Sequence, residues 1–123
     1  MMEITVLPQL FTVCQVRDFG QIDLGAPFVF TATTDQECSL VCPVEQAPEE
    51  SLLREDGWRA FRIEGILDFS LIVILAGISS VLAAAGIGIF AISTFNTDYV
   101  LVKEGDLDWA IDALTAEGYL ISK

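Results

Sequence analysis

Hydrophobic and polar positions divide the chain into a strand-rich first half and a second half in which strands alternate with helices. Between residues 4 and 16 apolar and polar side chains alternate loosely, with a break at Pro8, which predicts two short strands. Residues 28–30 and 38–42 flank a polar stretch that suits a hairpin turn. Residues 43–56 contain two prolines and five acidic side chains, so we expect a solvated connector with room for one helical turn. The first half is therefore expected to be mostly β-structure.

From residue 58 onward the pattern predicts the order strand, helix, strand, strand, helix, strand. The expected elements are a strand at 58–64 ending at Gly65, a helix from an N-cap at Asp68 to a stop at Gly86, strands at 87–93 and 99–102, a helix from Gly105 or Asp106 to Gly118, and a strand at 119–122. This order is the split βαβ arrangement of ferredoxin-like α+β folds. We therefore expect two helices covering one face of a four-stranded antiparallel sheet.

Residues 69–97 contain no charged side chain, and an uncharged stretch of this length can mark a membrane-spanning helix. The flanking charges, Asp68 and Asp98, are both acidic, whereas a spanning helix should have Lys or Arg on its cytoplasmic side. Glycines at 86 and 88 also interrupt the stretch midway. We expect a buried helix followed by a buried central strand, with no membrane partner. Because that helix is nearly apolar all round, it should be covered on a second side by the N-terminal half, a partner subunit or both.

Charge and composition exclude several classes of function. The 123 residues include Lys+Arg 6 and Asp+Glu 18, a net charge of −12, so nucleic-acid binding is excluded and anionic membrane surfaces are disfavoured. The absence of histidine removes His-based catalysis and most zinc and iron sites. An odd number of cysteines, Cys14, Cys38 and Cys42, favours a reduced cytoplasmic protein with buried free thiols. No metal or cofactor is expected.

Three runs of residues, 57–65, 67–70 and 85–102, resemble a small bacterial ACT-only branch of the ACT-domain proteins. The resemblance covers about residues 57–118, and its most specific part is Ile-Ser-Thr-Phe-Asn-Thr-Asp-Tyr at 92–99. The chain is also similar there to the ACT units of the cytosolic arginine sensor of TOR signalling. The resemblance implies an ACT domain (βαββαβ) at 58–123 and an incomplete, mostly β ACT-like unit with an acidic connector at 1–57.

A regulatory binding module, not an enzyme, is what the resemblance implies, because ACT domains pair side by side and commonly hold a free amino acid at the interface. We therefore expect a homodimer that binds an amino acid or related small metabolite and acts on a separate protein partner. The positions that match the ligand-binding parts of the family are Gly65, Leu67, Asp68, Phe69, Ser70, Ser93, Thr94, Asn96, Thr97 and Asp98. The alternative is a ligand-free ACT-fold protein that only dimerises or docks onto an enzyme.

Physical chemistry points to the same positions. Free N–H groups at the start of the first helix, around residues 69–71, suit a ligand carboxylate. Asp98, at the edge of the uncharged stretch, suits an ammonium group, with Thr97, Asn96 or Ser93 adding neutral hydrogen bonds. The structural alternatives are that Asp68 only caps the helix and that residues 96–98 form only a polar turn. Trp109, off the main stripe of its helix, is either a contact residue or partly buried.

Overall fold

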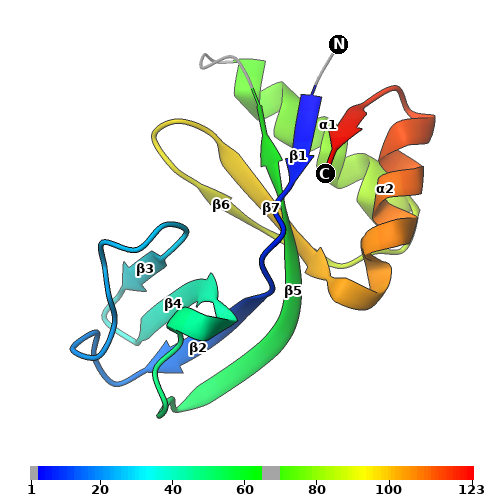
Figure 1. Cartoon of the computed structure of the whole chain (residues 1–123). Coiled ribbons are helices and arrows are strands. Elements are labelled where there is room, and N and C mark those ends of the chain that lie inside the picture. The colour runs from blue at the N-terminus through cyan, green and yellow to red at the C-terminus, as the bar shows by residue number, and fades with distance from the viewer. Residues whose placement is uncertain (1–2, 65–69) are drawn as a thin grey trace. The chain divides into compact units, whose positions relative to one another are not determined.

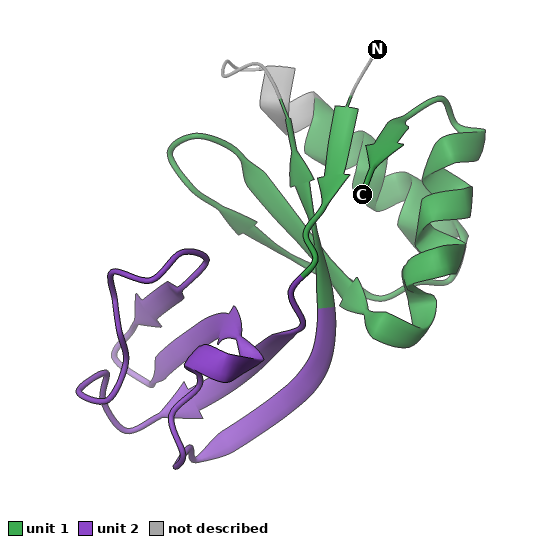
Figure 2. Cartoon of the chain, in the orientation of Figure 1, with its two compact units in different colours: residues 1–8, 59–123 green, residues 9–58 purple. Residues whose placement is uncertain are grey.

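The computed structural model describes residues 3–64 and 70–123. Contacts divide the chain into two compact units (Figure 2). Unit 1 consists of the described residues of 1–8 and 59–123, and unit 2 consists of residues 9–58. Strand β5 (Leu53–Ile63) contributes its first part to unit 2 and its last part to unit 1.

Unit 1 has one helical layer on one sheet. Its elements besides the end of β5 are β1 (Glu3–Val6), α1 (Ser70–Ala84), β6 (Ile89–Ser93), β7 (Asp98–Lys103), the 3-10 turn η2 (Glu104–Asp106), α2 (Leu107–Ala116) and β8 (Leu120–Ser122). The strand order is β8-β1-β5-β7-β6, and both helices lie on the same side of the sheet (Figure 1). The predicted α+β class and the predicted order of strands and helices are confirmed.

The sheet of unit 1 contains β1, a strand that was expected to belong to the first, ACT-like unit at 1–57. Strand β1 lies between β5 and β8, so the sheet has five strands where four were expected. Ile4 stands opposite Ile63 of antiparallel β5 and opposite Ile121 of parallel β8, and it is fully buried. Alternation along residues 3–6 predicts a strand with one apolar face, but it does not say which sheet that face joins.

Both helices end as the glycines predicted, because each glycine adopts a left-handed conformation that other residues avoid. Gly86 has φ 78°, its N–H donates to the Ala83 carbonyl at 3.0 Å, and the following N–H of Ile87 donates to the Leu82 carbonyl at 3.0 Å. This pair of bonds is a Schellman motif. Gly118, with φ 95°, ends α2 in the same way. The predicted helix stops are therefore confirmed.

The core of unit 1 lies between the helices and the sheet. Ile78 and Leu82 of α1 and Leu114 of α2 pack against Phe61 of β5, and all four are at most 1% exposed. The spacing of four between Ile78 and Leu82 is the period expected of a helix face that meets a core. Trp109 of α2 was expected to be either a contact residue or partly buried. It is 61% exposed, so it lies on the surface of this chain.

Strand β6 is not the buried central strand that was expected. Among the described strands it pairs only with β7, which places it at an edge of the sheet. Ala91 and Ser93 are exposed, and Ile92 is half-buried. The reason is topological, because β7 occupies the place beside β5 and leaves β6 outside it. Within the described residues, no helix is long and apolar enough to cross a membrane.

The regular elements of unit 2 are strands apart from one 3-10 turn, as the first half of the sequence predicts. Its elements are β2 (Phe11–Val16), β3 (Phe30–Thr33), β4 (Cys38–Pro43), the 3-10 turn η1 (Val44–Gln46) and the first part of β5, in the order β3-β4-β2-β5. The predicted hairpin is present, with Thr33 opposite Cys38. The connector, however, ends before Leu53, where a strand was expected only from Trp58. Residues 53–55 pair with β2, and this backbone pairing makes them part of a strand although Arg54 and Glu55 are charged.

The two units share a pattern at a spacing of 60 residues. Strand β4 and turn η1, at 38–43 and 44–46, have counterparts in β7 and η2, at 98–103 and 104–106. The hairpin turns correspond too, since the Thr34 N–H donates to the Glu37 carbonyl and the Thr94 N–H to the Thr97 carbonyl, both at 2.9 Å. The order β2-β4-β3 in unit 2 also matches β5-β7-β6 in unit 1. Where unit 1 has helix α1, unit 2 has the segment 17–29.

Candidate functional site

The turn between β6 and β7 carries five of the predicted ligand-binding residues, and its hydrogen bonds hold it in one shape. Ser93 and Asp98 form the last opposed pair of the hairpin. The Thr94 hydroxyl donates to the Thr97 carbonyl at 3.0 Å and accepts from the Thr97 N–H at 3.3 Å. The side chains of Ser93, Thr94 and Asn96 are exposed at this end of the hairpin. Such a turn presents its polar groups in a defined arrangement.

Thr97 connects this turn to the end of β5. Its hydroxyl donates to the Ile63 carbonyl at 2.6 Å, two residues before the segment that begins at Gly65. The structure therefore brings the second predicted motif, residues 93–98, beside Ile63 at the end of β5. Because the Thr97 hydroxyl already donates its proton to Ile63, only its lone pairs remain for another partner.

Asp98 begins β7 and is only 5% exposed. It is one of two buried polar or charged residues among the described residues, the other being Thr12. A carboxylate so far out of water is costly unless hydrogen bonds or a positive charge compensate it. Among the described residues of the predicted site, Asp98 is therefore the one charged side chain that is buried.

The other half of the predicted site cannot be placed. Four residues lie outside the described part of the chain: Gly65, Leu67, Phe69 and Asp68, the last of which is also the predicted N-cap. Ser70 is the first described residue of α1. The structure therefore brings together residues 93–98 and the end of β5, and the arrangement of residues 65–70 around a ligand stays a prediction.

A charged side chain near the end of β5 is paired with one directly after that strand. Nε of Arg62 lies 2.9 Å from Oε2 of Glu64, and both side chains are 32% exposed. Burial would by itself raise the pKa of Glu64, but hydrogen bonds from Thr5 and Arg62 lower it below its usual value. The hydrogen bond to Glu64 raises the pKa of Arg62, and a hydrogen bond with Tyr99 adds to it. Each of these two charges is therefore neutralised by the other at the end of β5.

The three cysteines are free, and two of them are buried in unit 2. Cys14 and Cys42 lie in one cluster with Leu40. Burial, followed by the neighbouring Cys14, raises the pKa of the Cys42 thiol to about 11. Cys42 is therefore almost entirely protonated at neutral pH and is a poor nucleophile. Within the described residues, no group of three or more His, Cys, Asp or Glu side chains is arranged to hold a metal ion.

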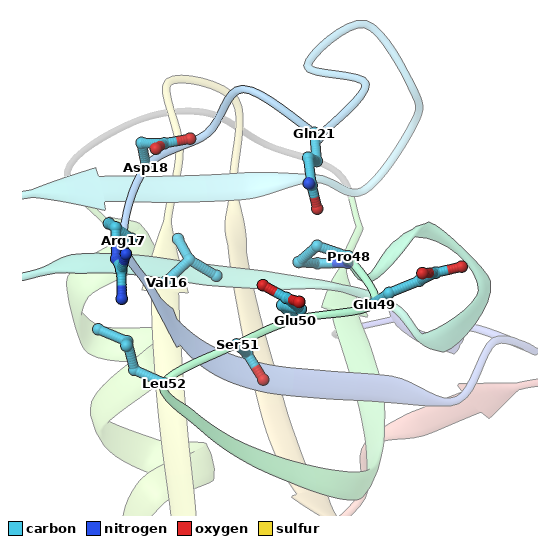
Figure 3. A pocket seen from close by; sticks show the side chains of 9 residues that line it. All are labelled: Val16, Arg17, Asp18, Gln21, Pro48, Glu49, Glu50, Ser51 and Leu52. Carbon is cyan, nitrogen blue, oxygen red and sulfur yellow. The ribbon is translucent and has the colours of Figure 1, made fainter.

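Sequence reasoning missed a pocket in unit 2. It has a volume of about 520 Å³ and lies between residues 16–21, at and after the end of β2, and residues 48–52, which precede β5 (Figure 3). The acidic residues of this second segment were interpreted as plain solvated surface. No local pattern could reveal the pocket, because its two walls are about 30 residues apart and only the pairing of β2 with β5 brings them together.

A family comparison identifies the second half of the chain. The ACT domain family matches residues 53–116, which is more than half of the 123 residues. This chain belongs to the ACT domain family. The matched ACT domain includes β5, α1, β6, β7 and α2, and hence the hairpin turn that carries Asp98. No curated protein matches the chain.

Solved structures with the same fold extend over nearly the whole chain. A protein from Agobacterium tumefaciens has a TM-score of 0.86 at 29% identity, with 98% of this chain and 91% of that one covered. The ligand-free regulatory subunit of aspartate kinase from Thermus thermophilus has a TM-score of 0.64 at 9% identity, with 94% and 96% covered. Aspartate kinase from Clostridium acetobutylicum has a TM-score of 0.65 at 14% identity, with 94% and 34% covered.

The aspartate kinase structures align with 94% of this chain, which includes residues of both units. The strand-rich unit 2 is therefore part of the shared fold. Together with the ACT match, these neighbours show that the chain has the fold of an ACT-domain protein. The likeness to the arginine sensor of TOR signalling stays a prediction.

Proposed function

We propose that this chain is a non-catalytic regulatory protein that binds a free amino acid, or a related small metabolite, through its ACT domain. The observation that carries the proposal is the carboxylate of Asp98, 5% exposed at the start of β7 in the matched ACT domain. An ammonium group of the ligand would compensate this buried charge. The turn at 94–97, fixed by its own hydrogen bonds, supports the proposal because a rigid turn loses little entropy when a ligand binds.

The remaining residues of the proposed site are Gly65, Leu67, Asp68, Phe69 and Ser70 on one side and Ser93, Thr94, Asn96 and Thr97 on the other. N–H groups at the start of α1 would bind the ligand carboxylate. The hydrogen bond from Thr97 to Ile63 supports this grouping, since it holds the turn near the point where the chain enters the segment 65–69.

A thermal-shift screen against the twenty amino acids tests the proposal, followed by calorimetry on any ligand found. Binding at a ligand concentration of about 100 Kd adds about 2.7 kcal/mol to the stability of the folded protein, which is easily measured as a rise in Tm. We expect one or two amino acids to give such a rise. Substituting Asp98→Asn keeps the shape and removes the charge, so it should weaken binding at least about 10-fold.

The matched control is Asp108→Asn, which makes the same change at an exposed position of α2 in the same unit. It should leave affinity unchanged. The proposal fails if no amino acid raises the Tm of the wild-type protein, or if Asp98→Asn binds as tightly as the control.

A second candidate function is a ligand-free ACT-fold protein that dimerises or docks onto a separate enzyme. The edge strand β6 supports it, because Ile92 is half-buried and Phe95 in the adjoining turn is 98% exposed. An edge strand with apolar side chains is suited to pairing with another chain. We propose a homodimer for both candidates, and sedimentation measures it directly. A dimer whose Tm responds to no amino acid would support the ligand-free protein.

We further propose that the incomplete ACT-like unit predicted at 1–57 corresponds to unit 2, residues 9–58, since β1 belongs to unit 1, and that the protein works in the cytoplasm. The 60-residue correspondence of strands and turns between the units supports the first statement. Three free cysteines support the second, because thiols persist in a reducing compartment.

A further inference from the structure

The pocket of unit 2 has the size and the walls of a small-molecule site. Its volume of about 520 Å³ falls in the range of ligand pockets, about 300–1,000 Å³. The apolar part of the lining comes from Val16 and Pro48, which are buried, and from Leu52, which is 53% exposed. An apolar surface of this kind can cover the methylene chain of a ligand.

The polar part of the lining is strongly unbalanced in charge. The lining includes one guanidinium, from Arg17, and three carboxylates, from Asp18, Glu49 and Glu50, and all four side chains are exposed. Figure 3 shows the side chains of Gln21 and Glu50 pointing toward one another across the pocket, whereas the carboxylate of Glu49 points away from the other labelled side chains. Two carboxylates, those of Asp18 and Glu50, therefore remain for a ligand, on the two different walls.

These charges are not used up within the protein. Among the described residues, Arg17 forms no ion pair and no side-chain hydrogen bond, and the same holds for Glu50. Asp18 accepts one hydrogen bond with Oδ1, from the Gly20 N–H at 2.9 Å, which fixes its side chain and leaves Oδ2 available. Two carboxylates on the two walls of a pocket with a partly apolar lining fit a molecule with two separated positive charges joined by a methylene chain.

We propose that this pocket binds a small aliphatic polyamine. One ammonium group would bind Glu50 and Gln21, the other would bind Asp18, and the methylenes between them would lie on Val16, Pro48 and Leu52. Arg17 opposes this binding, because its positive charge repels the ligand. Arg17 therefore limits the affinity, and the preference for ligands with more than one positive charge comes from the two carboxylates.

Calorimetry on the full chain with spermidine, putrescine and n-butylamine tests the proposal at about 0.15 M salt, where distant charges are screened. We expect spermidine to bind at least about 10-fold more tightly than n-butylamine, which has one positive charge. Glu50→Gln and Asp18→Asn should each weaken spermidine binding by about 10-fold. Asn at position 18 keeps an oxygen for the Gly20 N–H, so the fold of the loop is preserved.

Substitution of Arg17 separates this proposal from its closest competitor. For a polyamine, Arg17→Ala removes a repulsion and should tighten spermidine binding. For a zwitterion such as a free amino acid, the same change removes the carboxylate partner and should abolish binding. Loss of spermidine binding in Arg17→Ala, or binding of amino acids that depends on Arg17, would overturn the proposal.

The matched control addresses non-specific attraction to a chain of net charge −12. Asp35→Asn with Glu37→Gln removes two negative charges from the exposed β3–β4 turn of the same unit, outside the pocket. Spermidine affinity should stay within about 2-fold of wild type in this variant. A loss equal to that of Glu50→Gln with Asp18→Asn would show that spermidine senses only net charge. Asp98→Asn should leave spermidine binding unchanged, so the outcome is independent of the proposed amino-acid site.

Discussion

Strand β1 has a larger effect on stability than its four residues near the N-terminus suggest, and Ile4→Ala measures it. Ile4 is fully buried and is opposed by Ile63 on one side and Ile121 on the other. The change removes three carbon atoms, which at about 0.8 kcal/mol each corresponds to about 2.4 kcal/mol of lost transfer free energy. Neighbouring strands restrict collapse around the site, so a cavity contributes roughly 1 kcal/mol more. We expect a loss of about 3.4 kcal/mol.

Circular dichroism at 222 nm during urea or thermal unfolding reports this loss for unit 1 in particular, because both described helices belong to it. For the 123 residues of the chain, an unfolding entropy near 2.1 cal/mol/K per residue converts this loss of about 3.4 kcal/mol into a fall in Tm of about 13 °C. The control Leu120→Ala, on the neighbouring strand β8 and 52% exposed, should cost less than about 1 kcal/mol. If Ile4→Ala prevents folding, Ile4→Val should still cost about 0.5–1.5 kcal/mol. Equal losses at Ile4 and Leu120 would refute the central position of β1.

Three further changes test local features. Gly86→Ala should cost about 1–2 kcal/mol in urea unfolding, because φ 78° is unfavourable for any residue with a Cβ atom. A disulfide reagent at pH 8 should modify half-buried Cys38 first and Cys42 only on unfolding, because burial raises the pKa of the Cys42 thiol to about 11. Glu64→Gln should cost about 0.5 kcal/mol at pH 7, since the partner Arg62 is partly exposed to solvent. Because the folded pKa of Glu64 is lowered, this difference should be present above the ordinary value of 4.5 and disappear as the pH falls through the folded pKa.

Each of these has its own control. Gly88→Ala changes a glycine without positive φ and with open space around it, so its cost should stay below that of Gly86→Ala. Cys38→Ser should remove the fast phase of modification, and a fast phase that persists would show that a buried cysteine is accessible. Glu37→Gln lies in an exposed turn, and a pH profile for Glu64→Gln that matches it would contradict a role for the Arg62 pair.

The elements that the sequence predicts well are those that depend on neighbouring residues. Helix α2 ends at Ala116, two residues before the glycine that was expected to close it, and the hairpin at 33–38 forms where a polar stretch separates two apolar runs. These features are local because a left-handed glycine or a short turn is stabilised by hydrogen bonds within a few residues. Of the candidate site, the sequence points to Asp98, whose burial the structure confirms as unusual for a carboxylate.

The apolar stretch at 69–97 shows where such reasoning stops. Its lack of charge predicts burial on every side, and yet Ala91 and Ser93 of β6 are exposed at the sheet edge. Hydrophobicity reports how much apolar surface a segment carries, but the strand order decides how much of it the chain itself covers. The half-buried β6 is therefore compatible with the partner subunit that the sequence left open.

By itself, then, the sequence determined an α+β chain with two helices, their C-terminal stops, a strand-rich first half and an ACT-type motif around Asp98. Only the tertiary structure decided that β1 enters the sheet between β5 and β8, that β5 reaches back to Leu53, and that residues 16–21 and 48–52 form one pocket. The physical reason is that helix ends and turns are stabilised within a few residues. Strand neighbours and pocket walls depend on backbone pairing between segments far apart in the chain, and alternation along one strand does not specify its partner.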